Sequence, residues 1–293
     1  MIGAESLVRT LVAGGTDTAF VNPGTSEMHL VQAIDAVPEM RSVLSLFEGV
    51  CSGAADGYGR MTGRPAMTLF HLGSGLGNAV ANLHNARRAR TPLINLVGEH
   101  ATYHIKYDAP LTSDIAGIAG PVSNWVHTPQ SSGSMGQAGV DALEAARSGG
   151  GQVATLIVPA DCAWGPSDGP GTPLALPVLP EVSDEEVEAA VNAIKAGTRV
   201  VLLLGAKALD ERGIVAAQRI ADATGAELWR ETFAAKIERG AGLPKVERLP
   251  YFPEQAMEAL AGTDTLILAG AKEPVSFFAY ENLNSELTPE GCT

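Results

Sequence analysis

The sequence has little positive charge and few aromatic residues. Its 20 Lys and Arg residues stand against 33 Asp and Glu residues, which gives a net charge of −13 at pH 7, and aromatic residues make up only 5% of the chain. Such an acidic protein repels polyanions, including nucleic acids and anionic membrane surfaces. We therefore expect neither nucleic acid nor a membrane as its partner.

Cysteines and long hydrophobic runs are also scarce. Cys51, Cys162 and Cys292 are widely separated and lack the paired spacing of zinc ligands, so neither a disulfide framework nor a metal site is predicted. No run approaches the roughly 18 apolar residues that cross a bilayer, and residues 1–5 lack the charged and then apolar regions of a secretion signal. We expect a cytoplasmic protein.

The sequence does contain enough apolar residues to form buried cores. Hydrophobic residues make up 45% of the 293 positions, a length that suits two domains. Short β-rich runs alternate with helix-like stretches, which is typical of βα units around a parallel sheet. These runs cover residues 18–21, 42–47, 66–70, 93–97 and 153–158. They predict a first α/β domain over residues 1–160.

Prolines and glycines gather after this domain. The prolines of this stretch are Pro166, Pro170, Pro173, Pro177 and Pro180. Because proline interrupts helices and central strands, they predict an extended linker over residues 161–183.

The α/β pattern resumes after the linker. Ser183 and Glu186 have the spacing of a capping box, which predicts a helix that ends at Ala196. The further predicted elements are a strand at 199–204, a helix at 209–224 and a strand at 265–268. Residues 282–293 show no helix or strand signal with a clear partner. We predict a second, Rossmann-like domain over residues 184–293 and expect it to be incomplete, and each domain should hold a mainly parallel sheet flanked by helices.

Glu48 occupies the most informative position, because it follows the predicted strand at 42–47 and opens a helix. Ligands bind at the carboxyl ends of parallel strands, so this place suits a functional carboxylate. Gly49, Gly53 and Gly57 share one stripe of the helix although each costs about 1 kcal/mol relative to alanine, which predicts a close approach to that stripe. The alternative is that Glu48 only favours the helix dipole and that the glycines allow helix packing.

A glycine-rich segment, residues 73–77, lies between the predicted strand at 66–70 and a predicted helix at 78–90. It is a candidate anion-binding turn. With Glu99 as a ribose-binding acid, it would indicate a nicotinamide-dependent oxidoreductase. The spacing is G-x-G-x-G rather than G-x-G-x-x-G, which makes this the weaker alternative.

Three blocks together carry a family resemblance. They are Asn22-Pro23-Gly24-Thr25-Ser26-Glu27, the segment 47–60 around Glu48, and Gly73-Ser74-Gly75-Leu76-Gly77-Asn78-Ala79. Their order and spacing resemble the pyrimidine-binding domain of thiamine diphosphate-dependent enzymes, and the linker and second α/β domain resemble the family's middle domain. The resemblance implies the N-terminal portion of a 2-oxo acid decarboxylase or carboligase, similar to acetolactate synthases and benzoylformate decarboxylase.

The resemblance also implies roles for individual residues. Glu48 would activate the cofactor's aminopyrimidine ring. His71 matches a catalytic histidine of benzoylformate decarboxylase, and Thr25 matches the substrate-binding serine of that enzyme. The implied cofactor-binding residues are Glu48, Pro23, Gly24, Gly73, Gly75 and Asn78. The candidate substrate-binding residues are Thr25, Ser26, His71 and His100, the last because it follows the predicted strand at 93–97. Acetolactate synthases usually have a tyrosine in place of Asn22 and lack this histidine.

The family binds the diphosphate through Mg²⁺ and a Gly-Asp-Gly segment, and this sequence has no such segment. We expect the C-terminal diphosphate-binding domain, and Mg²⁺ with it, to be missing, so that the chain alone is inactive. The family builds its site between subunits, which implies self-association as a dimer or tetramer around a small 2-oxo acid substrate. FAD at the turn Gly205-Ala206-Lys207 is a less favoured alternative, and a non-catalytic relic of the family is another.

Overall fold

The computed structural model describes residues 1–175 and 181–293. The chain divides into two compact units, Met1–Leu179 and Pro180–Thr293. The first residues of the predicted linker, 161–164, are not extended but belong to helix α7 (Ala160–Trp164). Residues 176–180 of the predicted linker lie outside the described residues. Within the described residues, no helix has the length and apolar character needed to cross a membrane.

A six-stranded sheet with the order β2-β1-β3-β4-β6-β5 forms the centre of the first unit. Its strands are β1 (Thr18–Asn22), β2 (Arg41–Leu44), β3 (Ala66–Phe70), β4 (Leu93–Glu99), β5 (Trp125–His127) and β6 (Val153–Pro159). Every neighbouring pair is parallel. The predicted α/β class is confirmed. Five predicted strands are present, and β5, which has only three residues, was missed.

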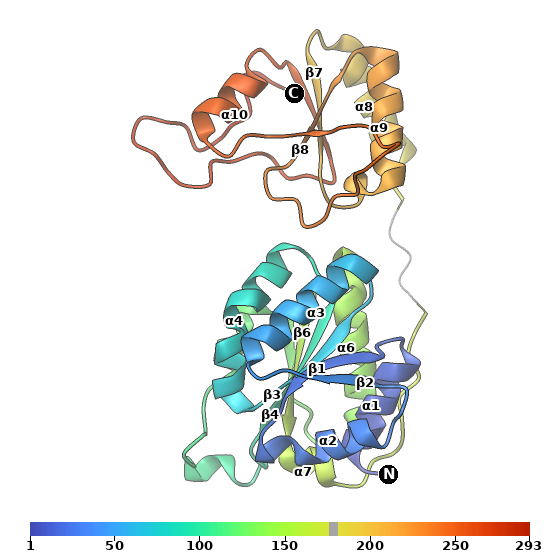
Figure 1. The fold of residues 1–293 in the computed structure, drawn as a ribbon, viewed down its shortest axis with the longest axis vertical. Helices are drawn as coiled ribbons and strands as arrows, with labels where there is room; N and C mark the ends of the chain where they lie inside the picture. Colours follow the sequence, from blue (N-terminus) through green and yellow to red (C-terminus); the bar gives the residue numbers. More distant parts are fainter. Residues whose placement is uncertain (176–180) are drawn as a thin grey trace. The chain divides into compact units, whose positions relative to one another are not determined.

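Helices cover both faces of this sheet, as Figure 1 shows. The helices are α1 (Gly3–Ala13), α2 (Met28–Asp35), α3 (Glu48–Thr62), α4 (Leu72–Arg88), α5 (Ile115–Ala119), α6 (Met135–Arg147) and α7. One core joins α1, α2, α6 and α7 to one face, and a second core joins α3, α4 and α5 to the other. Leu7 and Leu83, one from each core, are fully buried, and burial of such a side chain contributes about 1.5–3 kcal/mol.

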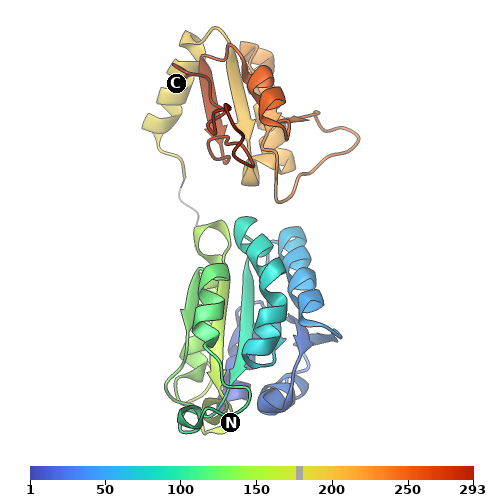
Figure 2. The ribbon, with the colours of Figure 1, turned by 90° about the vertical axis from the view of Figure 1, so that its left-hand side faces the viewer.

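Helices α3 and α4, which carry most of the predicted site, lie side by side, as both views of the ribbon show (Figures 1 and 2). The Ser52 hydroxyl donates to the carbonyl of Ala79 over 3.2 Å, and the Asn82 amide donates to the carbonyl of Gly49 over 2.7 Å. A Cβ atom at Gly53 would lie 3.2 Å from Asn82. The predicted close approach to the glycine stripe is therefore made in part by α4.

The second unit holds a parallel sheet with the order β10-β7-β8-β9. Its elements are α8 (Asp184–Ala196), β7 (Val200–Leu204), α9 (Glu211–Thr224), β8 (Glu227–Arg230), β9 (Glu247–Arg248), α10 (Pro253–Leu260) and β10 (Thr265–Ala269). Figure 1 shows α8 and α9 on one face and α10 on the other. The predicted capping box is present, since the Ser183 hydroxyl accepts from the Glu186 N–H.

The sequence missed several features of this second unit, including the helix α10. Strands β8 and β9 are short and largely half-buried or exposed, so they carry a weak apolar signal. The end of the chain does have a partner, because the Leu266 N–H donates to the carbonyl of Thr293 over 2.9 Å. Thr293 in turn donates its N–H to Asp264 over 3.0 Å. These bonds tie the last residue to the start of β10.

Candidate functional site

The Glu48 carboxylate is buried at the N-terminus of α3, with a residue exposure of 9%. Strand β2 ends at Leu44, earlier than predicted, and residues 45–47 lead from it to the helix. A carboxylate at this end of a helix is stabilised by the helix dipole. The Asn78 amide of α4 donates to Glu48 Oε2 over 3.0 Å, which fixes the orientation of the carboxylate.

Gly75 lies against the other oxygen of this carboxylate. A Cβ atom at Gly75 would come within 3.0 Å of Glu48 Oε1. In the described parts of the chain, 1–175 and 181–293, no hydrogen-bond donor is directed at Oε1. The site therefore holds a buried carboxylate with one oxygen bound by Asn78 and the other adjacent to a residue without a side chain.

The glycine-rich segment 73–77 is helical, which corrects the prediction of a turn before a helix at 78–90. Helix α4 begins six residues earlier, at Leu72, with His71 as its N-terminal flanking residue. The Gly75 N–H donates to the carbonyl of His71 over 2.8 Å, so the first helical turn is already formed there. Buried Leu72 has a φ of 52°, a left-handed conformation that costs about 1 kcal/mol or more outside glycine. This strained residue sets the direction in which the chain leaves His71.

His71 contacts Glu27, a residue to which the sequence had given no role. Glu27 has no exposed surface, and its Oε2 lies 2.8 Å from His71 Nδ1. The same oxygen accepts the Gly24 N–H over 2.8 Å. The second oxygen, Oε1, is buried without a hydrogen-bond partner in the described residues. A buried carboxylate needs hydrogen-bond partners. The contact with Glu27 therefore fixes the orientation of the His71 imidazole through its Nδ1 atom.

Two glycines make room for the Glu27–His71 pair. A Cβ atom at Gly24 would collide with the His71 ring, and one at Gly98 of β4 would collide with the Glu27 carboxyl group. Gly24 was predicted to bind cofactor, and the structure gives it a packing role beside His71. Its neighbour Pro23 is half-buried between the end of β1 and the short 3₁₀ helix Thr25–Glu27.

Thr25, Ser26 and His100 share a cavity of about 270 Å³. Trp164 and His104 also line it, and the His100 ring lies edge-on to that of His104 with centroids 5.6 Å apart. His100 Nε2 is buried and has no hydrogen-bond partner among the described residues. Three of the predicted substrate-binding residues are therefore brought together, whereas Glu48 and His71 do not line this cavity.

Glu99 precedes His100 at the end of β4 and is buried. Burial raises the pKa of its carboxyl group, although the N–H of His100 donates to it over 2.7 Å. The side chain thus bonds the next residue's backbone. That contact favours a structural role over the ribose-binding role of the nicotinamide alternative.

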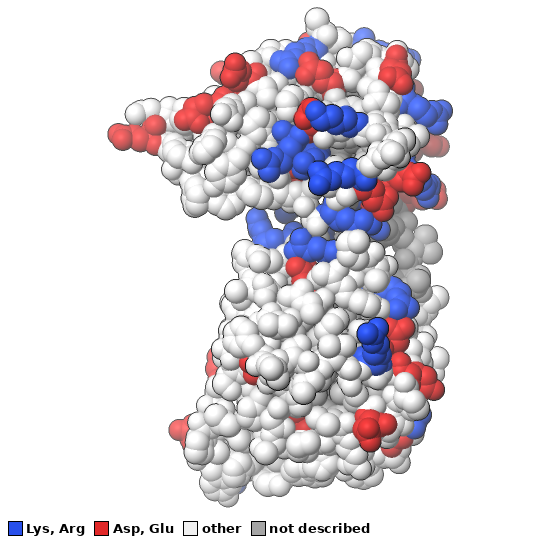
Figure 3. Space-filling model, in the orientation of Figure 1, with Lys and Arg blue, Asp and Glu red and all other residues white. Residues whose placement is uncertain are grey.

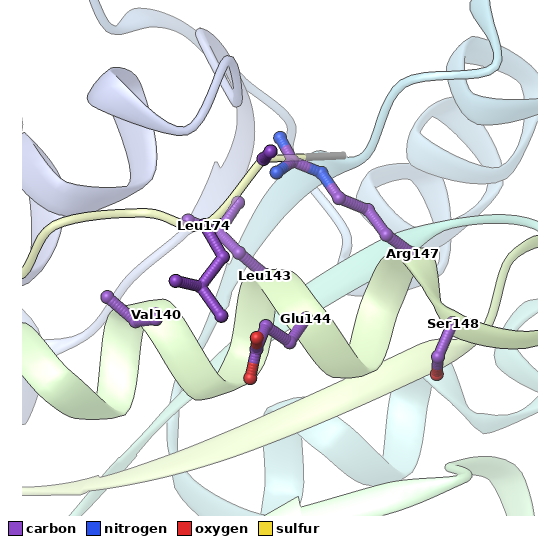
Figure 4. Close-up of a pocket in the computed structure, with 7 residues that line it drawn as sticks. Val140, Leu143, Glu144, Arg147, Ser148 and Leu174 are labelled. Carbon is purple, nitrogen blue, oxygen red and sulfur yellow. The ribbon is translucent and has the colours of Figure 1, made fainter. Parts of the chain in front are cut away.

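A second cavity, of about 340 Å³, lies along α6 and holds none of the predicted site residues. Figure 4 shows the side chains that line it, from Val140, Leu143, Glu144, Arg147, Ser148 and Leu174. The C-terminal turns of α6 lead into the start of β6, so they lie toward the amino ends of the strands. This is the edge opposite Glu48.

Cysteine reactivity provides a test of the packing. Cys162 is 2% exposed, and burial raises the pKa of its thiol to about 11, which leaves about one thiolate in a thousand at pH 8. Cys51 is also fully buried, and Cys292 is partly exposed. We expect iodoacetamide at pH 8 to label Cys292 first and Cys162 only after unfolding, as read by peptide mass spectrometry. Rapid labelling of Cys162 in the native protein would show that this core is open.

Comparison with known proteins relates the first part of the chain to one family. Residues 1–124 match the model of the thiamine pyrophosphate enzyme N-terminal TPP binding domain. This part of the chain is therefore similar to the N-terminal domain of thiamine diphosphate-dependent enzymes.

Individual relatives agree with this assignment. The chain is 53% identical over 292 residues to IlvX of Mycobacterium tuberculosis H37Rv, which is named as a candidate acetolactate synthase large subunit. This match covers 100% of the chain and 56% of that protein. It is 34% identical over 116 residues to benzoylformate decarboxylase of Pseudomonas aeruginosa, covering 39% of this chain and 22% of that protein. The chain thus spans about half the length of IlvX.

The fold also agrees with that of a solved structure. The thiamine diphosphate-dependent 4-hydroxybenzoylformate decarboxylase of Rhodococcus jostii RHA1 superposes with a TM-score of 0.84 at 23% identity. The match covers 100% of this chain and 55% of that chain. At this identity the likeness establishes the fold, while substrate and reaction are separate questions.

Proposed function

We propose that this chain forms the part of a thiamine diphosphate-dependent 2-oxo acid decarboxylase or carboligase that holds the cofactor's aminopyrimidine ring. Glu48 is the carboxylate that activates the ring. The observation that carries the proposal is the buried Glu48 carboxylate, held on Oε2 by Asn78 and left with Oε1 beside Gly75.

The chemistry of these residues fits an aminopyrimidine. A carboxylate in a poorly solvated place gains more from a hydrogen bond than one in water, because its own solvation is already lost. A heterocyclic nitrogen that can share a proton is a suitable partner for Glu48 Oε1. The absence of a side chain at Gly75 leaves room for the Glu48 carboxylate itself, because a Cβ atom there would come within 3.0 Å of Oε1.

Thiamine diphosphate, when bound, supplies the carbanion chemistry of such an enzyme. The chain's own part is positional and acid–base. Asn78 keeps the Glu48 carboxylate in one orientation, and Glu48 Oε1 would share a proton with the ring nitrogen. Pro23, Gly24 and Gly73 would be further residues that hold the cofactor.

The predicted substrate-binding residues suit a 2-oxo acid. His71 engages Glu27 through Nδ1, so Nε2 is the ring nitrogen that would face a substrate carboxylate. Thr25, Ser26 and His100 would line the substrate side through the 270 Å³ cavity.

Self-association is part of the proposal. Several large apolar side chains on and before α3 are exposed to solvent, namely Leu44, Leu46, Phe47, Val50 and Met61. Figure 3 shows few charged side chains over α3 and α4 on the visible face of this unit. Exposed apolar patches of this kind mark interaction surfaces. A second copy of the protein would cover the patch and complete a site at Glu48.

Calorimetry of the full-length protein with thiamine diphosphate and Mg²⁺ tests this proposal. We expect saturable binding that Glu48→Gln weakens about tenfold or more, since it removes a charge-assisted hydrogen bond. Glu39→Gln, at an exposed position, should leave the affinity unchanged. Binding by the wild-type protein without any turnover of 2-oxo acids would favour a non-catalytic relic. Absence of cofactor binding would overturn the proposal.

A further inference from the structure

The cavity of about 340 Å³ along helix α6 contains a positive charge next to apolar walls. Val140, Leu143 and Arg147 are spaced three or four residues apart, so they share one face of α6 and line the cavity from that helix. Leu174 and Ala175, from the segment that follows the last helix of the first unit, line it as well. The lining is therefore mostly aliphatic, and the Arg147 guanidinium lies toward the C-terminal end of α6.

The segment 171–175 is held close to the start of α6. A Cβ atom at Gly171 would lie 2.5 Å from the carbonyl oxygen of Gly136 and 2.7 Å from the Val140 side chain, so only glycine allows this approach. From there the segment passes along the helix toward Arg147, since its last two residues line the same cavity. Seven residues separate Val140 from Arg147, which makes the helical wall about 10 Å long.

Arg147 has no carboxylate partner. Within residues 1–175 and 181–293 it forms no ion pair, and its Nε is buried without a hydrogen-bond partner. Burial lowers the pKa of the guanidinium, which still carries its charge at neutral pH. Glu144 lines the same cavity, but Figure 4 shows its carboxylate directed away from the Arg147 guanidinium. A partly buried cation without a partner is costly, and an anion in the cavity would offset that cost.

Helix ends explain the sign of this charge. Arg147 is the last residue of α6, and a Cβ atom at Gly15, just beyond the end of α1, would lie 3.7 Å from its Nη2. Positive charge is favourable at the C-terminal ends of helices. An interaction with helix dipoles leaves the aliphatic wall of the cavity without an occupant, so it does not account for the cavity.

We propose that this cavity binds an aliphatic monocarboxylate, with Arg147 holding the carboxylate and the apolar side chains of the lining contacting the hydrocarbon chain. The planar guanidinium fork matches carboxylate oxygens. The volume of about 340 Å³ is near the lower end for ligand pockets, and a wall of about 10 Å suits a chain of about six carbons. The site lies at the edge of the first sheet opposite Glu48, so it is distinct from the proposed cofactor site.

Calorimetry of the full-length protein with hexanoate as the probe tests this proposal. We expect saturable binding with a dissociation constant of about 1 mM or below, weakened about tenfold or more in Arg147→Gln. Arg88→Gln, at an exposed position on α4, removes the same charge and should have no effect. Hexanamide has the same chain without the charge and should bind about tenfold more weakly or less tightly still.

A second variant tests the apolar wall without disturbing the core. Leu174 is 62% exposed, so Leu174→Ala should leave the melting temperature unchanged. The variant should weaken hexanoate about threefold or more, because it removes contacts with the hydrocarbon chain. Val182→Ala, at a position that is 68% exposed in the second unit, is the matched control and should leave hexanoate binding unchanged.

Three results would overturn the proposal. They are no saturable binding of hexanoate up to about 10 mM, undiminished binding in Arg147→Gln and Leu174→Ala, or an equal loss in Arg88→Gln. His71→Ala distinguishes this cavity from the proposed substrate side and should leave hexanoate binding unchanged. A loss confined to His71→Ala would place the acid there instead and would also contradict the proposal. Glu48→Gln should not affect hexanoate, so failure of the proposed function and failure of this site can be told apart.

Discussion

Turnover of 2-oxo acids by the full-length protein is expected to fall by about 10²- to 10⁴-fold when Glu48 is replaced by glutamine. Glutamine has the same shape and can still accept the Asn78 hydrogen bond, so the fold should remain. It cannot take up and release a proton at the Oε1 position. The loss should therefore appear in the rate of CO₂ release at saturating cofactor, with an unchanged melting temperature.

Matched variants sharpen this result. Glu39→Gln removes a carboxylate of the same unit at an exposed position and should retain full activity. Asn78→Ala should give an intermediate loss, because the carboxylate remains but is no longer oriented. A Glu48→Gln variant with a rate near that of the wild type would exclude Glu48 from the mechanism.

Replacing Glu27 by alanine is expected to lower the free energy of unfolding by about 2–4 kcal/mol. The substitution removes the acceptor for His71 Nδ1 and for the Gly24 N–H, and it leaves a void behind Gly98. Urea unfolding of the first unit, followed by circular dichroism, measures the change. Glu27→Gln keeps the volume and should cost less.

A double-mutant cycle with His71→Ala separates the pair from the packing. We expect a coupling energy of about 1 kcal/mol or more, since the two side chains are in contact. Glu5, whose ion pair with Arg9 is partly exposed, is a suitable comparison, and Glu5→Ala should cost at most about 1 kcal/mol. Additive losses for Glu27 and His71 would contradict the orienting role given to Glu27.

Local signals made much of the fold predictable. The alternation of short apolar runs and helix-like stretches identified five of the described strands of the first unit, because βα units repeat within a few tens of residues. The capping box of Ser183 and Glu186 depends on residues three positions apart and is present. Predictions failed where the local signal was weak, as for the short strands β5, β8 and β9, or misleading, as for the glycines that open α4.

The candidate site was predictable only in part. The position of Glu48 after a strand and before a helix could be inferred, and its link to Asn78, 30 residues away, could not. Glu27 carried no motif of its own apart from its place in the block around Thr25. Its carboxylate becomes significant only because β4 brings Gly98 behind it and α4 presents His71 in front.

By itself the sequence indicated most of the helices and strands, the resemblance to thiamine diphosphate enzymes and Glu48 as a candidate site residue, because periodicity, caps and motif spacing are properties of neighbouring residues. The tertiary structure alone decided which side chains meet. Parallel register pairs Arg230 with Arg248, and the sheet order brings Glu27 to His71 across 44 residues of chain. Such contacts depend on how distant segments pack in the sheet, and no local pattern encodes that arrangement.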